Sequence, residues 1–190
     1  SHKCFERLEE LQTFADIHTI KADLSDHGSI TSAIRQSEPD EIYNLAAQSF
    51  VGASFQQPIL TADITGLGVL RVLEAVKENA PDAKFYQASS SEMYGDYPGE
   101  KNDDSPFIPR SPYGAAKVFG HHITNHYREA YNIFACCGIL FNHESPLRGL
   151  EFVTRKITST LARIKYKKTN VLKLGNINAR RDWGFAGDYV

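Results

Sequence analysis

Tyr113 and Lys117 stand four residues apart in a stretch with a helical pattern, so their side chains lie on one face, one turn apart. An ammonium close to a tyrosine favours the phenolate and lowers the pKa of the phenol from its ordinary value of about 10. A phenol tuned in this way can act as a general base near neutral pH. Because Tyr and Lys are common, the spacing alone also fits a pair on the helix surface.

Hydroxyls and a carboxylate precede this helix. Ser89, Ser90, Ser91 and Glu92 come at the end of the stretch 84–89, which has the pattern of a strand. In a parallel sheet, that strand end lies at the edge where ligands bind. A base, a cation, a hydroxyl and a carboxylate could then meet on one substrate. The alternative is an ordinary serine turn followed by a solvated glutamate.

The composition is that of a globular protein without an obvious nucleic-acid or membrane partner. Of 190 residues, 42% are hydrophobic, and 21 Lys and Arg against 23 Asp and Glu leave a formal charge of −2. No apolar run approaches the roughly 18 residues that a membrane-spanning helix needs. Cys4, Cys136 and Cys137 lack the spacing of metal ligands. We therefore expect a cytoplasmic protein with free thiols and no metal site.

Apolar runs alternate with helical patterns, which predicts an α/β fold with a Rossmann-like, doubly wound parallel sheet. The predicted strands cover residues 17–24, 41–47, 84–89, 133–141 and 170–174. The predicted helices cover residues 26–38, 61–79, 112–127 and 153–164, and a polar loop covers 96–109. Helical spacing assigns to the core Ile30, Ala33, Ile34, Ile64, Leu67, Leu70, Leu73, Val76, Ala116, Phe119, Ile123 and Tyr127.

The start of the sequence lacks the glycine-rich turn that binds a dinucleotide phosphate, since Gly28 is the only glycine before residue 50. We therefore expect a partial domain, without its first strand–helix unit and without a carboxyl-terminal substrate region. The missing turn also fits a non-catalytic nucleotide-binding fragment, because backbone amides at a helix start normally hold the pyrophosphate.

Several stretches resemble the extended short-chain dehydrogenases/reductases that act on nucleotide sugars, and among them the GDP-mannose 4,6-dehydratase family. Together they span most of the chain from Ala22 onward. Nucleotide-sugar 4-epimerases typically lack the glutamate at 92, and dTDP-glucose dehydratases usually have an acidic pair there; another dehydratase or an epimerase is the alternative. The stretches are 44–49 (NLAAQS), 87–95 (QASSSEMYG), 109–114 (PRSPYG), 141–146 (FNHESP), 152–156 (FVTRK) and 181–184 (RDWG).

The resemblance implies a hydro-lyase that converts GDP-mannose into GDP-4-keto-6-deoxymannose and water by an internal NADP redox cycle. Tyr113 would take the proton of the sugar 4-hydroxyl while hydride passes to NADP, and Lys117 would hold the nicotinamide ribose and keep Tyr113 acidic. Glu92 would take the C5 proton, Ser90 would assist departure of the 6-hydroxyl, and hydride would return to C6. Ser90 stands where the family commonly has threonine, which also supplies a hydroxyl.

The resemblance also implies the contacts of cofactor and substrate. Residues 1–190 would form a partial NADP-binding domain, with a sugar-nucleotide-binding region starting at about residue 142, in a homodimer or homotetramer. Leu60 replaces a tyrosine that some relatives have near the cofactor. NADP is expected to contact Asp23, Leu24, Leu45, Ala46, Ala47, Gln48, Ser49, Lys117, His143 and Arg148. GDP-mannose is expected to contact Asn142, Glu144, Val153, Lys156 and Arg181.

Overall fold

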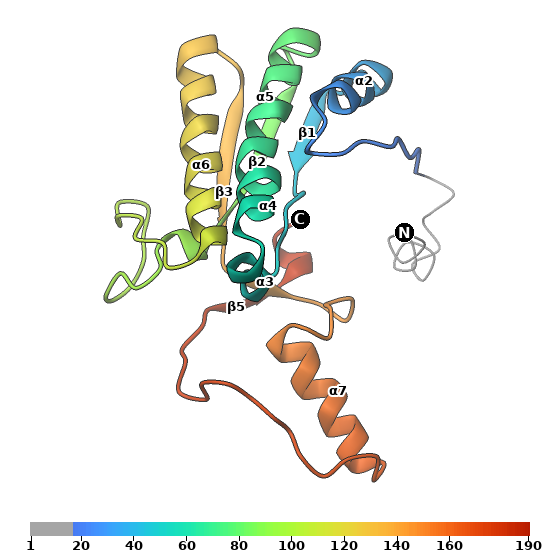
Figure 1. Cartoon of the computed structure of the whole chain (residues 1–190), viewed down its shortest axis with the longest axis vertical. Coiled ribbons are helices and arrows are strands. Elements are labelled where there is room, and N and C mark those ends of the chain that lie inside the picture. Colours follow the sequence, from blue (N-terminus) through green and yellow to red (C-terminus); the bar gives the residue numbers. More distant parts are fainter. Residues whose placement is uncertain (1–16) are drawn as a thin grey trace. The chain divides into compact units, whose positions relative to one another are not determined.

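The structure is a computed structural model that describes residues 17–190. It contains two compact units, of which one spans Thr19–Leu140 and the other includes Phe141–Val190. Each unit has its own sheet, with three strands in the first and two in the second. The chain can be followed by colour in Figure 1.

A parallel sheet forms the centre of the first unit. Its strands, in their spatial order, are β1 (Glu41–Asn44), β2 (Lys84–Ser90) and β3 (Ala135–Leu140). Phe85 of β2 lies opposite Ile42 of β1 on one side and opposite Ala135 of β3 on the other. Parallel neighbours need long crossover connections, and these are helical here. The predicted α/β fold with a parallel sheet is confirmed.

The first and last α-helices of this unit follow the prediction and begin at capped turns. Asp26 accepts a hydrogen bond from the Gly28 amide at the first helix, and Ser111 accepts one from the Gly114 amide at the last, at 3.0 Å. In chain order the helices are α2 (His27–Ser37), α3 (Val51–Gln56), α4 (Pro58–Thr61), the π-helix η3 (Ala62–Leu67), α5 (Gly68–Asn79), the 3₁₀-helix η4 (Ser91–Met93) and α6 (Pro112–Tyr131). The predicted helix 61–79 is divided between α4, η3 and α5, and α3 was not predicted.

The core of this unit lies between α2, α5 and the sheet. Leu73, Val76 and Phe85 are 0%, 0% and 1% exposed. Leu67 and Phe119 were assigned to the core but are 44% and 40% exposed. For Leu67 the reason is η3, because a π-helix bonds each residue to the fifth along the chain and so rotates later side chains off the α-helical face.

Glycines allow η3 and α5 to approach α6 closely. A Cβ on Gly120 of α6 would lie 3.1 Å from Cγ2 of Val69 in α5, and a Cβ on Gly66 would lie 3.7 Å from that of Ala116. The buried face of α6 runs through Gly120 and Thr124, and Phe119 lies at its edge. This packing determines where α6 sits on the sheet.

Two predicted strands are absent. Residues 17–23 lie outside every helix and strand, and residues 170–174 join neither sheet of the described part of the chain. The predicted strand 41–47 also ends early, at Asn44. An apolar pattern indicates only a local preference for extended backbone. A strand forms only where a neighbouring strand pairs with its backbone N–H and C=O groups.

The second unit is small. Strands β4 (Asn142–Glu144) and β5 (Trp183–Phe185) pair in parallel, α7 (Val153–Lys165) lies between them in the sequence, and the 3₁₀-helix η5 (Ala186–Asp188) follows β5. The predicted helix 153–164 is confirmed, but the two strands were not predicted because three residues carry no periodicity. Among the described residues, no helix is long and apolar enough to cross a membrane.

Candidate active site

Four residues with catalytic potential gather where β2 ends and α6 begins. Ser90 is the last residue of β2, Glu92 follows in η4, and Tyr113 and Lys117 lie in the first two turns of α6. The start of α6 packs directly on η4, since a Cβ on Gly114 would lie 2.7 Å from the Glu92 carbonyl oxygen. The structure thus brings all four predicted catalytic residues to one edge of the sheet.

Lys117 is a buried cation beside Tyr113. It is 4% exposed, and its Nζ donates a 2.8 Å hydrogen bond to the carbonyl oxygen of Ala88 in β2. The same Nζ lies 5.7 Å from the centre of the Tyr113 ring, which is itself buried. Burial lowers the pKa of Lys117 to about 8, because loss of water disfavours the ammonium. The two residues therefore form an interior pair, which removes the surface-pair alternative.

The serines that end β2 enter different environments, as alternating strand positions do. Ser90 Oγ accepts a 3.2 Å hydrogen bond from the Glu92 amide, while Ser89 Oγ lies 3.0 Å from Nδ1 of His121. Ser89 and Ser90 are both buried, whereas Glu92 is exposed. Ser90 and Glu92 are therefore the hydroxyl and the carboxylate available at this edge.

Of the residues predicted to contact the cofactor, Asp23, Leu24 and the loop 45–49 lie in the first unit, and the loop follows the carboxyl end of β1. The Asp23 carboxylate accepts hydrogen bonds from Oγ and the amide of Ser25 at 2.7 and 2.8 Å, which lower the pKa of that carboxyl. Leu24 packs on Gly68 at the start of α5. After β1, Leu45 is 64% exposed. Three further loop residues are exposed or half-buried, namely Ala46, Ala47 and Ser49.

Gln48 anchors this loop and offers an unused acceptor. Its amide donates to Oγ1 of Thr65 in η3 at 3.1 Å, and its Nε2 donates to the carbonyl oxygen of Phe50 at 3.2 Å. Its Oε1 is buried and has no hydrogen-bond partner within the described part of the chain. An unpaired buried acceptor is costly, so a donor from a bound molecule fits here. The polar groups at this edge thus fit the predicted dinucleotide.

Part of the remaining predicted site is assembled in the second unit. Glu144 of β4 accepts a hydrogen bond from Oγ1 of Thr154 in α7, and Nε of Arg148 forms an ion pair with the Glu144 carboxylate at 3.5 Å. His143 Nδ1 lies 3.0 Å from the carbonyl oxygen of Phe141. Glu144, His143 and Arg148 are therefore held by the unit's own polar groups.

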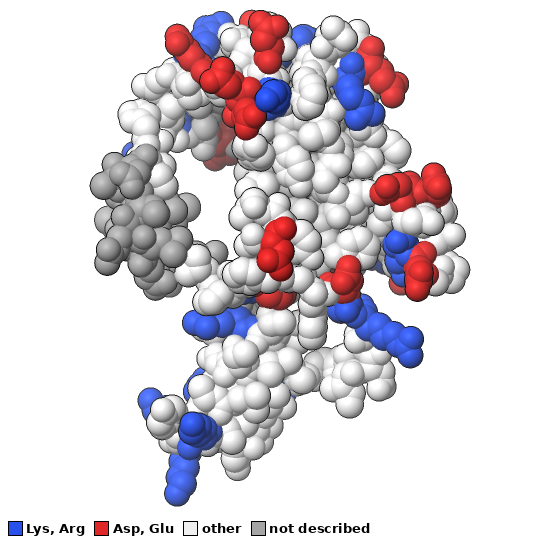
Figure 2. Space-filling model, turned by 180° about the vertical axis from the view of Figure 1, so that it is seen from behind, with Lys and Arg blue, Asp and Glu red and all other residues white. Residues whose placement is uncertain are grey.

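Other predicted substrate contacts are spread along this unit. Asn142 is held in β4, where its backbone N–H donates a hydrogen bond to the Asp182 carbonyl oxygen at 3.2 Å. Val153 begins α7, Lys156 follows one turn later, and Arg181 precedes β5; all three are exposed. Residues 141–190 hold 10 Lys and Arg against 4 Asp and Glu. Figure 2 shows basic side chains projecting from the α7 end, which suits a diphosphate.

Sequence reasoning missed a buried amide pair next to Lys117. Asn44, the last residue of β1, is 6% exposed, and Gln87 of β2 is 1% exposed. Asn44 Nδ2 donates to Gln87 Oε1 at 2.7 Å. The available signal was an amide side chain inside each of two predicted parallel strands, since such strands are usually buried on both faces.

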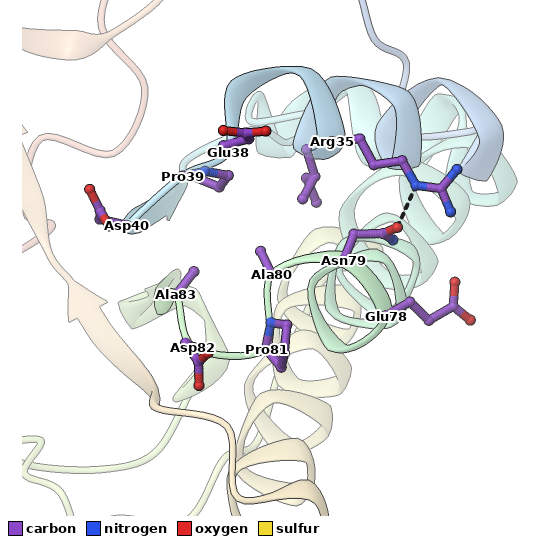
Figure 3. Close-up of a pocket in the computed structure, with 11 residues that line it drawn as sticks. Arg35, Glu38, Pro39, Asp40, Glu78, Asn79, Ala80, Pro81, Asp82 and Ala83 are labelled. Carbon is purple, nitrogen blue, oxygen red and sulfur yellow. Dashed lines mark hydrogen bonds between the residues drawn. The ribbon is translucent and has the colours of Figure 1, made fainter.

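Two cavities of the first unit are lined by none of the four catalytic candidates. One, of about 730 Å³, is lined by the loop before α6, by α6 and by β3. Another, of about 550 Å³, lies at the ends of α2 and α5, where Arg35 Nε donates to Asn79 Oδ1 at 2.6 Å (Figure 3). Asp40 and Ala83, which line this second cavity, precede β1 and β2. It therefore occupies the opposite edge of the sheet from Ser90.

Comparison with known proteins gives a consistent family. A family profile described as "GDP-mannose 4,6 dehydratase" matches residues 1–190. The chain is 56% identical to GDP-mannose 4,6 dehydratase 2 of Arabidopsis thaliana over 173 residues, 89% of this chain and 46% of that protein. It is 51% identical to the GDP-mannose 4,6 dehydratase of Homo sapiens over 171 residues, 88% of this chain and 46% of that protein. The chain thus spans about half the length of these relatives.

Solved structures share the fold. RMD from Pseudomonas aeruginosa, complexed with NADPH, aligns with a TM-score of 0.84 at 26% identity, covering 95% of this chain and 66% of that one. A double mutant of DesIV, a dTDP-glucose 4,6-dehydratase from Streptomyces venezuelae, aligns with a TM-score of 0.78 at 21% identity, over 88% of this chain and 50% of that one. The family resemblance read from the sequence motifs is therefore confirmed, and the chain belongs to the GDP-mannose 4,6-dehydratase family.

Proposed function

We propose that the protein containing this chain is a hydro-lyase that converts GDP-mannose into GDP-4-keto-6-deoxymannose and water, with NADP as cofactor. The observation that carries the proposal is the meeting of Ser90, Glu92, Tyr113 and Lys117 at one sheet edge of a chain from this family. When bound, NADP supplies the acceptor and later the donor of one hydride. The polar groups of Asp23, of the 45–49 loop and of Lys117 would hold it.

The proton steps follow from the four side chains. Tyr113 Oη takes the proton of the sugar 4-hydroxyl, and the Lys117 ammonium stabilises the phenolate. The resulting ketone acidifies the proton at C5, which the exposed carboxylate of Glu92 takes. Ser90 Oγ accepts a hydrogen bond from the Glu92 amide, so its own proton can be donated to the departing 6-oxygen. Glu92 then passes the C5 proton to Ser90 Oγ, which restores both side chains. The net loss at this stage is the C5 proton and the 6-hydroxyl, as one water.

Residues from about 142 onward would bind the sugar nucleotide, through Asn142, Glu144, Val153, Lys156 and Arg181. Support comes from the excess of basic residues in 141–190, because a diphosphate needs cations. His143 and Arg148 would contact NADP. Residues 1–190 would then be a partial NADP-binding domain with the start of the substrate region.

The proposal includes a homodimer or homotetramer in the cytoplasm. Support for the oligomer comes from large apolar side chains left exposed on α4, η3 and α6, which are neighbours in the first unit. Ile59, Leu67 and Phe119 are 85%, 44% and 40% exposed. Cys136 and Cys137 are free thiols, which suits a reducing compartment.

The test is an assay of the full-length gene product with NADP and GDP-mannose carrying deuterium at C4, followed by mass spectrometry. The expected product has lost one water and retains the deuterium, because the hydride taken from C4 returns to C6. Tyr113→Phe should abolish turnover, and Glu92→Gln should lower kcat by about a hundredfold. Tyr131→Phe and Glu129→Gln, exposed positions at the far end of α6, are the matched controls.

The outcomes separate the alternatives. Turnover without loss of water would indicate an epimerase, and loss of water only from another sugar nucleotide would replace the substrate. NADP binding without any turnover would favour a non-catalytic nucleotide-binding protein. Full activity in Tyr113→Phe would contradict the role given to the phenol.

A further inference from the structure

A chain of buried hydrogen bonds leads from β1 through β2 to Lys117. Asn44 Nδ2 donates to Gln87 Oε1 at 2.7 Å, and Gln87 Nε2 donates to the Ala88 carbonyl oxygen at 2.9 Å. Lys117 Nζ donates to that same oxygen at 2.8 Å. Asn44, Gln87 and Lys117 are 6%, 1% and 4% exposed, so water does not compete for these bonds.

We propose that Asn44 and Gln87 are positioning residues for Lys117: they orient the acceptor that holds the Lys117 ammonium beside Tyr113. The proposal rests on the proposed function, in which that ammonium stabilises the Tyr113 phenolate. Neither amide is assigned any contact with substrate or cofactor.

The two hydrogen bonds of Gln87 fix the orientation of its side-chain amide. Gln87 must turn its N–H group toward the Ala88 carbonyl, because its own carbonyl oxygen there would face another acceptor. With Gln87 Oε1 pointing the other way, it needs a donor, which Asn44 Nδ2 provides. Asn44 therefore fixes the orientation of the Gln87 amide.

Gln87 in turn restricts where Lys117 can bind. A carbonyl oxygen has two lone pairs, and Gln87 occupies one of those on Ala88. The ammonium takes the other, so its direction of approach is defined. A lysine has a flexible four-carbon stem, and this second constraint holds its charge 5.7 Å from the Tyr113 ring centre. Without Gln87 the ammonium could approach the oxygen from either side.

The first test replaces Gln87 with methionine, which keeps the volume and removes both hydrogen bonds. With GDP-mannose we expect kcat to fall about tenfold and KM to stay within about twofold, because substrate contacts are unchanged. The acidic limb of the kcat–pH profile should move up by about one pH unit, since a displaced ammonium stabilises the phenolate less. A merely structural role would lower kcat equally at every pH.

Thr124→Val is the matched control. Thr124 is fully buried in the same helix and donates a 2.8 Å hydrogen bond to the Gly120 carbonyl oxygen, away from Ala88. This variant should lose stability but keep the pH profile of the wild type. A shift in Thr124→Val equal to that in Gln87→Met would overturn the proposal, as would an unshifted profile in Gln87→Met.

A second variant tests the proposal even if Gln87→Met does not fold. Asn44→Leu leaves Gln87 in place but frees its amide to turn, so it should shift the profile in the same direction by a smaller amount. The double variant should match Gln87→Met alone, because Asn44 acts through Gln87. Independent effects that add in the double variant would refute this order of action.

A third readout needs no turnover. Acetylation of Lys117 by acetic anhydride, followed by mass spectrometry, should be about tenfold faster in Gln87→Met than in wild type or Thr124→Val, because a released amine becomes accessible. If wild type fails to dehydrate GDP-mannose but this rate difference appears, the proposed function falls and the positioning role stands. Equal labelling rates in all three proteins would refute the positioning role, whatever the activity.

Discussion

Lys117 provides a quantitative test of the reasoning, because the structure places an ionisable group almost entirely out of water. Its pKa is about 8 in the folded protein and 10.5 when exposed. Between these values the unfolded chain binds more protons than the folded one, so stability rises with pH. Above pH 10.5 the amine is neutral in both states, so burial of Lys117 carries no cost for a charge. As the pH falls toward 8, the cost of burying the ammonium lowers the free energy of unfolding again.

The size of the effect follows from the shift. One pKa unit corresponds to about 1.36 kcal/mol, so burial of the ammonium costs about 3 kcal/mol below pH 8. Most of this cost, about 2.5 kcal/mol, should disappear between pH 7 and pH 10. Tyr127 titrates in the opposite sense, since burial and its hydrogen bond to Glu74 raise its pKa, so a difference measurement is needed.

Lys117→Met supplies that difference, because methionine keeps an unbranched stem and carries no charge. Urea unfolding without added cofactor, at pH 7 and pH 10, gives the free energy of unfolding of each protein. The wild type should gain about 2.5 kcal/mol relative to Lys117→Met over this range. Lys84→Met, at an exposed lysine, controls for the loss of one positive charge. Parallel pH dependences of wild type and Lys117→Met would refute the buried-ammonium argument.

Substitutions at four positions test the fold. Gly95→Ala should lower the free energy of unfolding by more than about 2 kcal/mol in urea titrations, since φ is 51° and a Cβ would collide with the Ile108 carbonyl; Gly99→Ala, at φ 83° in open space, should cost only about 1 kcal/mol. Leu73→Ala should cost about 2–5 kcal/mol by the same measurement, because it leaves a cavity in the core, and a smaller loss would mean that the core collapses around it. Ser111→Ala should cost about 1 kcal/mol by removing the cap of α6, whereas Ser111→Asp should retain most of it.

The sequence predicts well the helices and strands that are determined by neighbouring residues along the chain. Ser111 and Pro112 mark the start of α6, and the apolar stretch of β2 is long enough to show its type. The four catalytic candidates could also be found, because β2 and the spacing of Tyr113 and Lys117 place them together once the sheet is parallel.

What the sequence misses depends on contacts between distant segments. Strands β4 and β5 have three residues each, and each is a strand only because it pairs with the other. The π-helix η3 exposes Leu67 in a stretch whose spacing is that of an α-helix. The hydrogen bond from Lys117 to Ala88 joins residues 29 positions apart, and no periodic pattern in the sequence predicts it.

The glycine contacts between α5 and α6 limit how this protein could be engineered. Replacing helical glycines with alanine is a common route to a higher Tm, because it reduces the disorder of the unfolded chain. At Gly120 the new methyl group would lie 3.1 Å from Cγ2 of Val69, so the Val69 side chain or α6 would have to shift by a few tenths of an ångström. Since α6 carries Tyr113 and Lys117, any shift of this helix would also move the pair to which we assign the proton transfer.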